Sequence, residues 1–543
     1  MKQTEALSVE NKLAKFDGGL TLVGHKHLST GYAISSLEQS KLYIVPLQQH
    51  IGAISQPLVK AGDRVLKGQM LARPGDLVSA AVHSPVSGMV REIKPHDIPH
   101  ISGLSDLCIV IENDFEDEWV ERKPIGDEYN NTNSSNMRKI VRDAGIVGLG
   151  GATFPSSVKQ TEMNVKTLIL NGVECEPYIT CDDALMREYA KEVVSGADII
   201  GHIIKARQCI IAIEDNKPEA IKAMQSVIDL DGTGFFKIQV VPTIYPSGGE
   251  KQLIQIITGQ EVPKGRYPAE LGVLCHNVAT AYAIHRAVYC DEPLISRVVT
   301  VTGHGVKQPQ NVEVLIGTPM QACIEHCGGY TSDSDELIMG GPMMGFSLKS
   351  DDLPVIKATN CLLVTAKDEN TRKQQHLPCI RCGKCVEACP VRLLPQQLYW
   401  YASSQNTDRL IEYNLFDCIE CGCCAYVCPS EIPLVQYYRY AKTTIWQQER
   451  ERKLSDIARE RHEAHQLRLD KIKLEREEKL RKKRELLKKK SEAQSGENSG
   501  DEKSSKQAAI AEAIARAQAK KAQRNKDLEN EGLGNKNKET GQN

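Results

Sequence analysis

The chain has 543 residues, a net charge of −2 and 41% hydrophobic residues, so it is long enough for about three to five domains with ample cores. Its N-terminus lacks the charged-then-apolar pattern of an export signal, and 18 cysteines in such a chain argue for a reducing compartment without disulfides. No apolar stretch approaches the roughly 18 to 20 residues that span a bilayer, so any membrane role is expected to be peripheral.

Short strand-like runs broken by glycine and proline come first. Two stretches, 59–69 and 83–90, resemble the halves of a biotinyl or lipoyl carrier domain, which is a flattened β-sandwich. Carriers present a lysine on the hairpin between these halves, but residues 68–93 contain none. We therefore expect a barrel-sandwich hybrid domain over residues 13–113 with a structural role. An unrelated β-domain is the alternative.

An acidic and polar linker, residues 114–136, precedes an expected Rossmann-like α/β domain over residues 137–292. Apolar strand-like runs alternate there with helical stretches. The expected strands are 167–170, 209–213 and 237–241, and the expected helices are 184–202 and 219–229. This alternation predicts parallel strands covered by helices.

The β pattern returns over residues 296–350, with a strand at 297–302 and a short helix near 320–326, which suits a small β-grasp module. A ferredoxin-like domain is expected over residues 369–443. Its two cysteine runs are separated by 28 residues whose apolar spacing suggests helices, so we expect a helix-rich version.

Two cysteine runs share one spacing, in which three cysteines at steps of three are followed by a fourth before proline. In two-cluster ferredoxins this spacing wraps three thiolates onto one 4Fe-4S cluster and sends the fourth to the neighbouring cluster. Structural zinc is the weaker alternative, because zinc sites usually combine two separated pairs. The predicted ligands are Cys379, Cys382, Cys385 and Cys428 for one cluster, and Cys389, Cys418, Cys421 and Cys424 for the other. Cys423 is off the spacing and is expected to be a packing thiol or a competitor for iron.

The tail, residues 447–543, is charged and low in complexity. From 447 to 490 it has 17 Lys and Arg against 10 Asp and Glu, so this segment is basic while the rest of the chain is acidic. We expect a basic helix to residue 494, a Gly/Ser/acidic break at 495–505 and an Ala-rich helix at 507–522. A solvated tail is one interpretation, and binding to acidic lipid head groups or to a partner is the other.

A glycine-rich patch, residues 145–159, is the second informative motif. Clustered glycines let backbone amides approach a phosphate or a planar ring, and Lys159 adds positive charge. The patch fits neither the dinucleotide fingerprint nor the phosphate loop, so spacing alone leaves a tight turn and a nucleotide site equally open.

Three further segments, 171–177, 245–250 and 276–280, follow this patch in an order that resembles the flavin-binding subunit of respiratory complex I. That resemblance implies one pocket for FMN with NADH stacked on it. The implied FMN contacts are Gly148, Gly150, Gly151, Lys159, Asn171, Glu176, Asn277 and Thr280, and the implied NADH contacts are Phe154, Glu174 and Glu250. Each of these residues could instead be core or turn. This sequence departs from the family's pattern at Leu149, Val173, Lys251 and His276.

The whole domain order, over residues 13 to 446, resembles the RnfC component of the Rnf (Rsx) ion-translocating oxidoreductase. The resemblance implies a peripheral, NADH-linked translocase subunit on the cytoplasmic side of the inner membrane. It would pass electrons from NADH through FMN to two 4Fe-4S clusters and on to integral partner subunits, with ferredoxin as a linked redox partner and no nucleic acid. Hydride transfer needs stacking, so we expect no catalytic acid-base residue.

Two alternatives remain open. One is a 4Fe-4S electron-transfer module whose central domain is degenerate and binds no nucleotide. The other is the flavin subunit of a soluble dehydrogenase or hydrogenase, although the N-terminal β-domain disfavours it.

Overall fold

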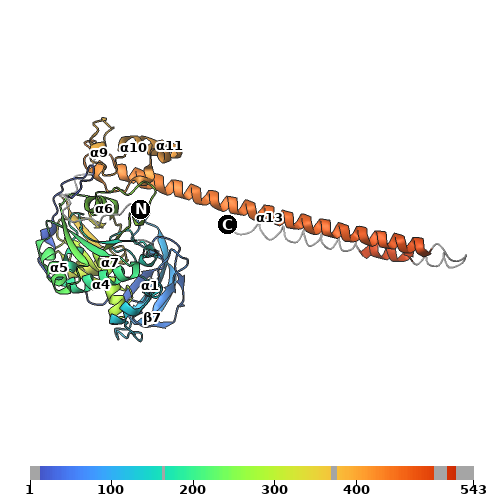
Figure 1. The fold of residues 1–543 in the computed structure, drawn as a ribbon, viewed down its shortest axis with the longest axis horizontal. Helices are drawn as coiled ribbons and strands as arrows, with labels where there is room; N and C mark the ends of the chain where they lie inside the picture. The colour runs from blue at the N-terminus through green and yellow to red at the C-terminus, as the bar shows by residue number, and fades with distance from the viewer. Residues whose placement is uncertain (1–12, 162–164, 368–375, 495–509, 521–543) are drawn as a thin grey trace, which may run out of the picture. The chain divides into compact units, whose positions relative to one another are not determined.

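The computed structural model describes residues 13–161, 165–367, 376–494 and 510–520 (Figure 1). The chain divides into two compact units, residues 1–446 and 447–543. The predicted break at 495–505 lies outside the described residues, as do residues 369–375 of the predicted ferredoxin domain. Within the described ranges, no helix combines the length and the apolarity needed to cross a membrane.

The N-terminal β-domain consists of two small sheets around one apolar core. The first has the strand order β2-β8-β7-β4 and the second β3-β5-β6. Tyr43, Leu71 and Ile109 are among the side chains that fill the core between them. The strands are β2 (Leu42–Pro46), β3 (Gln56–Pro57), β4 (Arg64–Val65), β5 (Met70–Arg73), β6 (Val82–His83), β7 (Gly88–Asp97) and β8 (Ser105–Asn113).

The central domain contains a four-stranded parallel sheet in the order β11-β10-β9-β12. Alternate residues of β9 face opposite sides, since Leu168 and Leu170 lie in one core and Ile169 in the other. A parallel sheet buried on both faces explains the continuous apolar runs in the sequence. The strands are β9 (Thr167–Gly172), β10 (Gln208–Glu214), β11 (Phe236–Val241) and β12 (Val273–Asn277).

Helices cover both faces of this sheet (Figure 1). The expected single helix at 184–202 is two helices, because Tyr189 leaves the helical region with φ −121° and ψ 36°. The helices are α1 (Ser134–Asp143), α2 (Ser156–Lys159), α3 (Cys181–Glu188), α4 (Ala190–Ile204), α5 (Pro218–Asp231), α6 (Glu250–Thr258) and α7 (Val278–Tyr289).

The third sheet has six strands in the order β1-β14-β13-β17-β15-β16. Two of its strands, β1 and β17, lie outside the predicted module at 296–350, because strand pairing recruits segments from far along the chain. The elements are β1 (Ser35–Ser36), β13 (Ser296–Thr302), β14 (Gln310–Leu315), α8 (Met320–His326), β15 (Ser334–Met339), β16 (Phe346–Ser347) and β17 (Cys361–Ala366).

The cysteine-rich part is helical, as expected, and packs around Leu398, Leu410 and Tyr438. Its last helix, α13, begins at Leu434, well before the predicted start at 447, and continues to Gln494. Residues 510–520 are also helical, within the predicted Ala-rich helix. The helices are α9 (Lys384–Glu387), α10 (Pro395–Ser403), α11 (Thr407–Glu412), α12 (Cys423–Tyr426) and α13 (Leu434–Gln494).

A buried lysine joins three parts of the first unit. The ammonium of Lys357 donates to the carbonyl of Ala81 at 2.8 Å and to that of Gly145 at 2.6 Å. Burial lowers the pKa of Lys357 to about 7. Burial and the nearby charge of Lys357 together lower the pKa of His83 to about 3, so this junction holds its titratable groups in a dry environment.

This junction predicts a specific pH dependence of stability. Because the folded pKa of Lys357 lies below the usual lysine value, the unfolded chain binds more protons between about pH 7 and 10.5. Stability contributed by this residue therefore rises with pH across that window. The melting temperature of the natural chain should rise relative to that of the Lys357→Met variant as the pH is raised from neutral to alkaline. Exposed Lys349→Met is the control, and equal pH profiles for all three proteins would contradict the prediction.

Candidate functional site

The two cysteine runs adopt one backbone conformation twice. Each cysteine of the first run has a counterpart 39 residues later, as Cys379 and Cys418 show. The backbone repeats as well, since Gly383 and Gly422 have φ values of 83° and 82° and each precedes a short helix, α9 or α12. Glycine is favoured there because other residues rarely adopt this conformation.

The structure gathers the eight predicted ligands into two sets. A cavity of about 500 Å³ is lined by Cys379, Cys382, Cys385 and Cys428. A smaller cavity of about 20 Å³ is lined by Cys389, Cys418, Cys421 and Cys424. Each set takes three cysteines from one run and the fourth from the other. Cys423 lines neither of these two cavities and is buried beside Tyr245 and Ala388.

The donor chemistry of these sets fits 4Fe-4S clusters. Four thiols converge in each set, and backbone amides are directed at the sulfurs: Leu393 N donates to Cys389 Sγ and Glu420 N to Cys418 Sγ, both at 3.4 Å. Hydrogen bonds to sulfur are one means by which proteins tune cluster potentials. The assignment of the eight cysteines as cluster ligands remains a prediction.

The glycine-rich loop lies at the carboxyl edge of the parallel sheet. Asn171 and Asn277 are paired in register at the ends of β9 and β12. A β-carbon at Gly150 would lie 3.4 Å from the side chain of Asn277, and Leu149 N donates to Thr280 Oγ1 at 2.9 Å. Open α/β sheets bind ligands at this edge, so the loop and these side chains occupy the expected place for a cofactor.

The neighbouring candidates are held by contacts with the protein. Gly148 closes the loop, since its N–H donates to the carbonyl of half-buried Phe154 at 2.9 Å, while Gly151 has φ +113°. Lys159 at the end of α2 pairs with Glu250 at the start of α6, at 2.8 Å. The structure therefore brings Gly148, Gly150, Gly151, Phe154, Asn171, Asn277 and Thr280 to one edge and joins Lys159 to Glu250.

Buried polar atoms beside this edge support a polar ligand. Among the described residues, Ser156 Oγ, both amide atoms of Gln160 and His276 Nε2 are buried without a hydrogen-bond partner. Gln160 directly follows Lys159, His276 directly precedes Asn277, and Ser156 lies two residues after the NADH candidate Phe154. Because buried polar atoms are normally paired, a bound polar group is a natural partner for them, and the residues present fit FMN.

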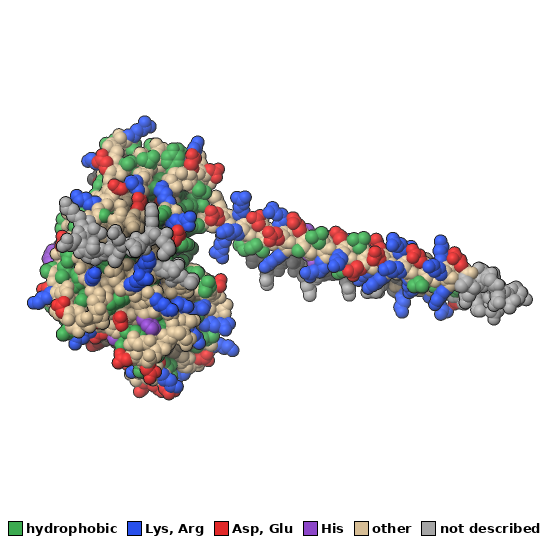
Figure 2. Space-filling model, viewed as in Figure 1, with side chains coloured by type: hydrophobic (Ala, Val, Ile, Leu, Met, Phe, Trp, Pro, Cys, Tyr) green, Lys and Arg blue, Asp and Glu red, His purple; other side chains and the backbone are tan. Residues whose placement is uncertain are grey.

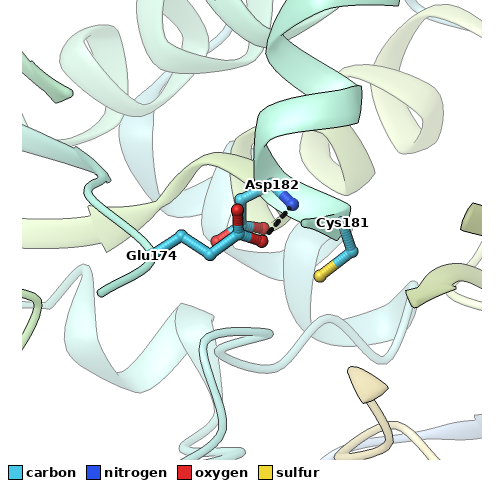
Figure 3. Close-up of side chains that lie close together, drawn as sticks. All are labelled: Glu174, Cys181 and Asp182. Atoms are coloured by element: carbon cyan, nitrogen blue, oxygen red, sulfur yellow. Dashed lines mark hydrogen bonds between the residues drawn. The ribbon is translucent and has the colours of Figure 1, made fainter. Parts of the chain in front are cut away.

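Two acidic side chains, Glu174 and Asp182, lie close together near Cys181 (Figure 3). Glu174, which follows β9, accepts a hydrogen bond from Asp182 N at 2.7 Å at the start of α3, and Cys181 lies beside them. Asp182 in turn accepts from Asn277 Nδ2 at 2.6 Å. Burial raises the pKa of Glu174 to about 8 and that of Asp182 to about 6. Their oxygens already serve protein donors, so we assign no metal to this group.

Glu176 has a different environment from Glu174. Its carboxylate accepts from Met343 N at 2.8 Å and Met344 N at 3.1 Å in the turn between β15 and β16. A β-carbon at Gly341 would lie 2.3 Å from Glu176 Cγ, so this turn needs glycine to approach. Glu176 therefore links the α/β domain to the third sheet through these two hydrogen bonds.

The second cysteine set touches the α/β domain directly. Tyr245 Oη donates to the carbonyl of Cys421 at 2.6 Å. The N-terminal strand passes the same place, because Gly19 N donates to the carbonyl of Ala388 at 3.2 Å and Leu20 pairs with Tyr245. A β-carbon at Gly18 would lie 2.7 Å from Cys389, which accounts for glycine there. The set containing Cys389 and Cys421 is thus seated on the predicted flavin domain.

Sequence patterns missed a clamp on the loop 174–179. The ammonium of Lys26 donates to the carbonyls of Glu174, Glu176 and Ile179 at 2.7, 2.8 and 2.5 Å. Gly24 accepts from Tyr178 N at 2.7 Å, and the ring of His25 stacks on Tyr178 at 4.5 Å. No local motif marks Lys26, because its partners lie about 150 residues away.

A buried ion pair lies on the other side of this loop. Lys217 donates to Glu214 at 2.9 Å and to the carbonyl of Val173 at 2.8 Å. The side chains of Lys217 and Glu214 are only 4% and 0% exposed. Lys and Glu are seldom fully buried, so hydrophobic patterns in the sequence do not assign them to a core. This pair therefore could not be predicted from the sequence.

Family models match four consecutive parts of the chain. Residues 14–116 match the RnfC barrel sandwich hybrid domain, 141–286 the Nuo51 FMN-binding domain, 298–347 the SLBB domain and 378–432 the 4Fe-4S dicluster domain. Together with the loop at the sheet edge and the paired cysteine sets, these matches define a protein that combines an FMN-binding type of domain with a 4Fe-4S dicluster domain.

Named relatives extend over most of the chain. The C component of the ion-translocating oxidoreductase complex from Vibrio cholerae serotype O1 is 46% identical over 94% of this chain, and that from Rhodobacter capsulatus is 48% identical over 70%. These matches span 65% and 73% of the relatives' own lengths. The chain belongs to this RnfC family of ion-translocating oxidoreductase components.

A solved structure of an NAD+-reducing NiFe-hydrogenase in its air-oxidized state overlays on part of the chain. It covers 54% of this chain and 58% of its own, with 16% identity and a TM-score of 0.40. This partial overlay adds nothing to the family assignment.

Proposed function

We propose that this chain is the peripheral electron-input subunit of a membrane-bound complex that couples electron transfer to ion translocation. NADH is the proposed electron donor, integral subunits are the proposed acceptors, and ferredoxin is a linked partner. When bound, FMN supplies the conversion of a hydride pair into single electrons, and each 4Fe-4S cluster carries one electron at a time.

The chain's own residues supply binding, orientation and exclusion of water. The loop 148–151 with Asn277 and Thr280 would hold FMN at the sheet edge, and Lys159 would add positive charge there. The two cysteine sets would hold the clusters. No side chain is assigned to proton transfer, because the chemistry belongs to the bound groups.

One observation carries this proposal. The cysteines of the second set lie against the domain that bears the candidate flavin edge, with Tyr245 Oη bonded to the carbonyl of Cys421 at 2.6 Å. This seating would give electrons a short route from the flavin domain into the cluster domain.

A second candidate function is a 4Fe-4S electron-transfer module without nucleotide chemistry. It is favoured by Leu149 and Val173, which are buried in apolar cores where the family pattern has charged residues. Anaerobic purification separates the two. About eight irons and one FMN, with bleaching by NADH, would support the proposal. Iron without flavin or bleaching would select the second candidate, and zinc in place of iron would contradict both.

The Lys26 clamp yields a further prediction for flavin binding. Glu174 and Tyr178 both have positive φ, at 51° and 70°, and such strain persists only where the surroundings enforce it. Lys26→Met removes the donor that three carbonyls share, and each hydrogen bond contributes about 0.5–1.5 kcal/mol. We expect FMN affinity, measured by flavin titration of the apoprotein, to fall about tenfold or more.

His27→Ala is the matched control, because His27 is the exposed neighbour of Lys26. Equal flavin affinity in Lys26→Met and the natural chain would contradict a role for the clamp in the site. A fall in both variants would point to a general disturbance of the N-terminal segment.

A further inference from the structure

Beyond Trp446, the net positive charge of α13 is concentrated in one short segment. Between residues 447 and 478 the helix has nine Lys and Arg and nine Asp and Glu, so this part is neutral. From 479 to 490, the basic segment, it has eight Lys and Arg and a single acid, Glu485, which gives +7. The basic residues are thus concentrated at one end of the helix. In a solvated helix without a partner, positive and negative side chains would be expected to alternate along its whole length.

Two ion pairs of the neutral part join residues three positions apart along the helix. Arg459 pairs with Asp456 at 2.7 Å, and Lys473 lies 3.8 Å from Asp470. Within the basic segment itself a single acid stands among eight cations, so ion pairs inside the segment leave most of its positive charge in place. Like charges at this density repel one another, which favours an external anionic partner.

The basic segment presents its cations on every side. Arg481, Lys482, Lys483 and Arg484 are consecutive, and at about 100° per residue they surround the helix axis. All residues of the segment are exposed, and Figure 2 shows the charged side chains standing out along α13. A surface of many equivalent anions fits this arrangement better than one directional pocket.

Leucines lie among these cations. Leu480 and Leu487 are seven residues apart, share one side of the helix and are 55% and 58% exposed. The turn between them carries Lys483 and Arg484, so the segment lacks the continuous apolar stripe that a protein groove binds. It also has no aromatic, Asn or Gln side chain for stacking on bases or reading their edges. Exposed leucines among long-stemmed cations instead suit the head-group region of a bilayer.

We propose that residues 479–490 bind the surface of a membrane rich in anionic phospholipid. Clusters of four to eight Lys and Arg on a helix attract such surfaces electrostatically. The proposal does not depend on flavin or iron, because the segment belongs to the second unit of the chain and both cysteine sets belong to the first.

Vesicle co-sedimentation with the purified full chain tests this inference. The natural chain should bind vesicles of phosphatidylcholine mixed with phosphatidylglycerol and should dissociate from them in high salt. It should not bind vesicles made only of phosphatidylcholine. One variant reverses four cations of the basic segment, and binding to anionic vesicles should weaken about a hundredfold. Its changes to Glu are at Lys482, Lys483, Lys488 and Lys489.

The matched control makes the same change of charge in the neutral part of α13, with Glu at Arg459, Arg461, Lys471 and Lys473. It should keep binding close to that of the natural chain, and circular dichroism checks that both variants stay helical. Equal losses in both variants, equal binding to neutral vesicles, or preference for duplex DNA over anionic vesicles would each overturn the proposal. Should either variant lose helicity, the salt and lipid dependence of the natural chain decides by itself.

Discussion

Cys389→Ser is expected to remove about four of about eight irons, and the lost cluster should be the one held by the other cysteine run. The physical reason is that Cys389 follows the first run in sequence but lines the cavity of Cys418, Cys421 and Cys424. Serine cannot supply a soft thiolate to iron. Iron analysis of the variant measures how much iron remains, and EPR of the reduced protein shows which cluster remains.

Double variants show which cluster each cysteine serves. Cys389→Ser combined with Cys418→Ser should keep about four irons, because both changes fall on one cluster. Cys389→Ser combined with Cys379→Ser should lose nearly all iron, because they fall on different clusters. Cys423→Ser is the control and should keep both clusters. If the two double variants gave the opposite result, each run would hold its own cluster.

Lys217→Met is expected to destabilise the α/β domain by about 3–5 kcal/mol, because it leaves the carboxylate of Glu214 buried without its partner. Both side chains are almost fully buried, and the change also removes the hydrogen bond to Val173. Urea unfolding and amide exchange in β9 and β10 would measure the loss.

A second substitution separates this cause from a simple packing defect. Adding Glu214→Leu to Lys217→Met should recover much of the stability, since apolar pairs often replace buried ion pairs without loss. The exposed pair of Arg266 and Glu270 provides the control, and Arg266→Met should cost less than about 1 kcal/mol. A small effect of Lys217→Met would show that Glu214 finds another partner.

Features set by local spacing could be predicted from the sequence. The strands β9, β10 and β11 follow from short apolar runs, and their observed bounds lie within one or two residues of the expected ones. The grouping of cysteines follows from spacing too, because the turn of each run fixes three thiols and leaves the fourth outside. These patterns depend only on residues that are close in the chain, so a single sequence is enough to recognise them.

Features that depend on distant partners could not be predicted. Lys26 contacts carbonyls at residues 174–179, and no periodic pattern connects two such segments. The same holds for β1, which pairs with β14 although Ser35 and Val312 lie far apart in the sequence. The break at Tyr189 is also a tertiary effect, because the sequence around it favours a continuous helix. At the candidate flavin edge, the candidate residues could be named from the sequence. The residues that bond to Glu174, Glu176 and Glu250 could not.

We propose that electrons from NADH reach the clusters that the cysteine sets would hold within this one chain. The most direct test of this proposal is EPR of the anaerobically purified, flavin-loaded chain, frozen at intervals after mixing with NADH. The account predicts signals of reduced 4Fe-4S clusters that grow as the flavin absorbance bleaches. Clusters that dithionite reduces but NADH leaves oxidised, in a chain containing FMN and about eight irons, would contradict it.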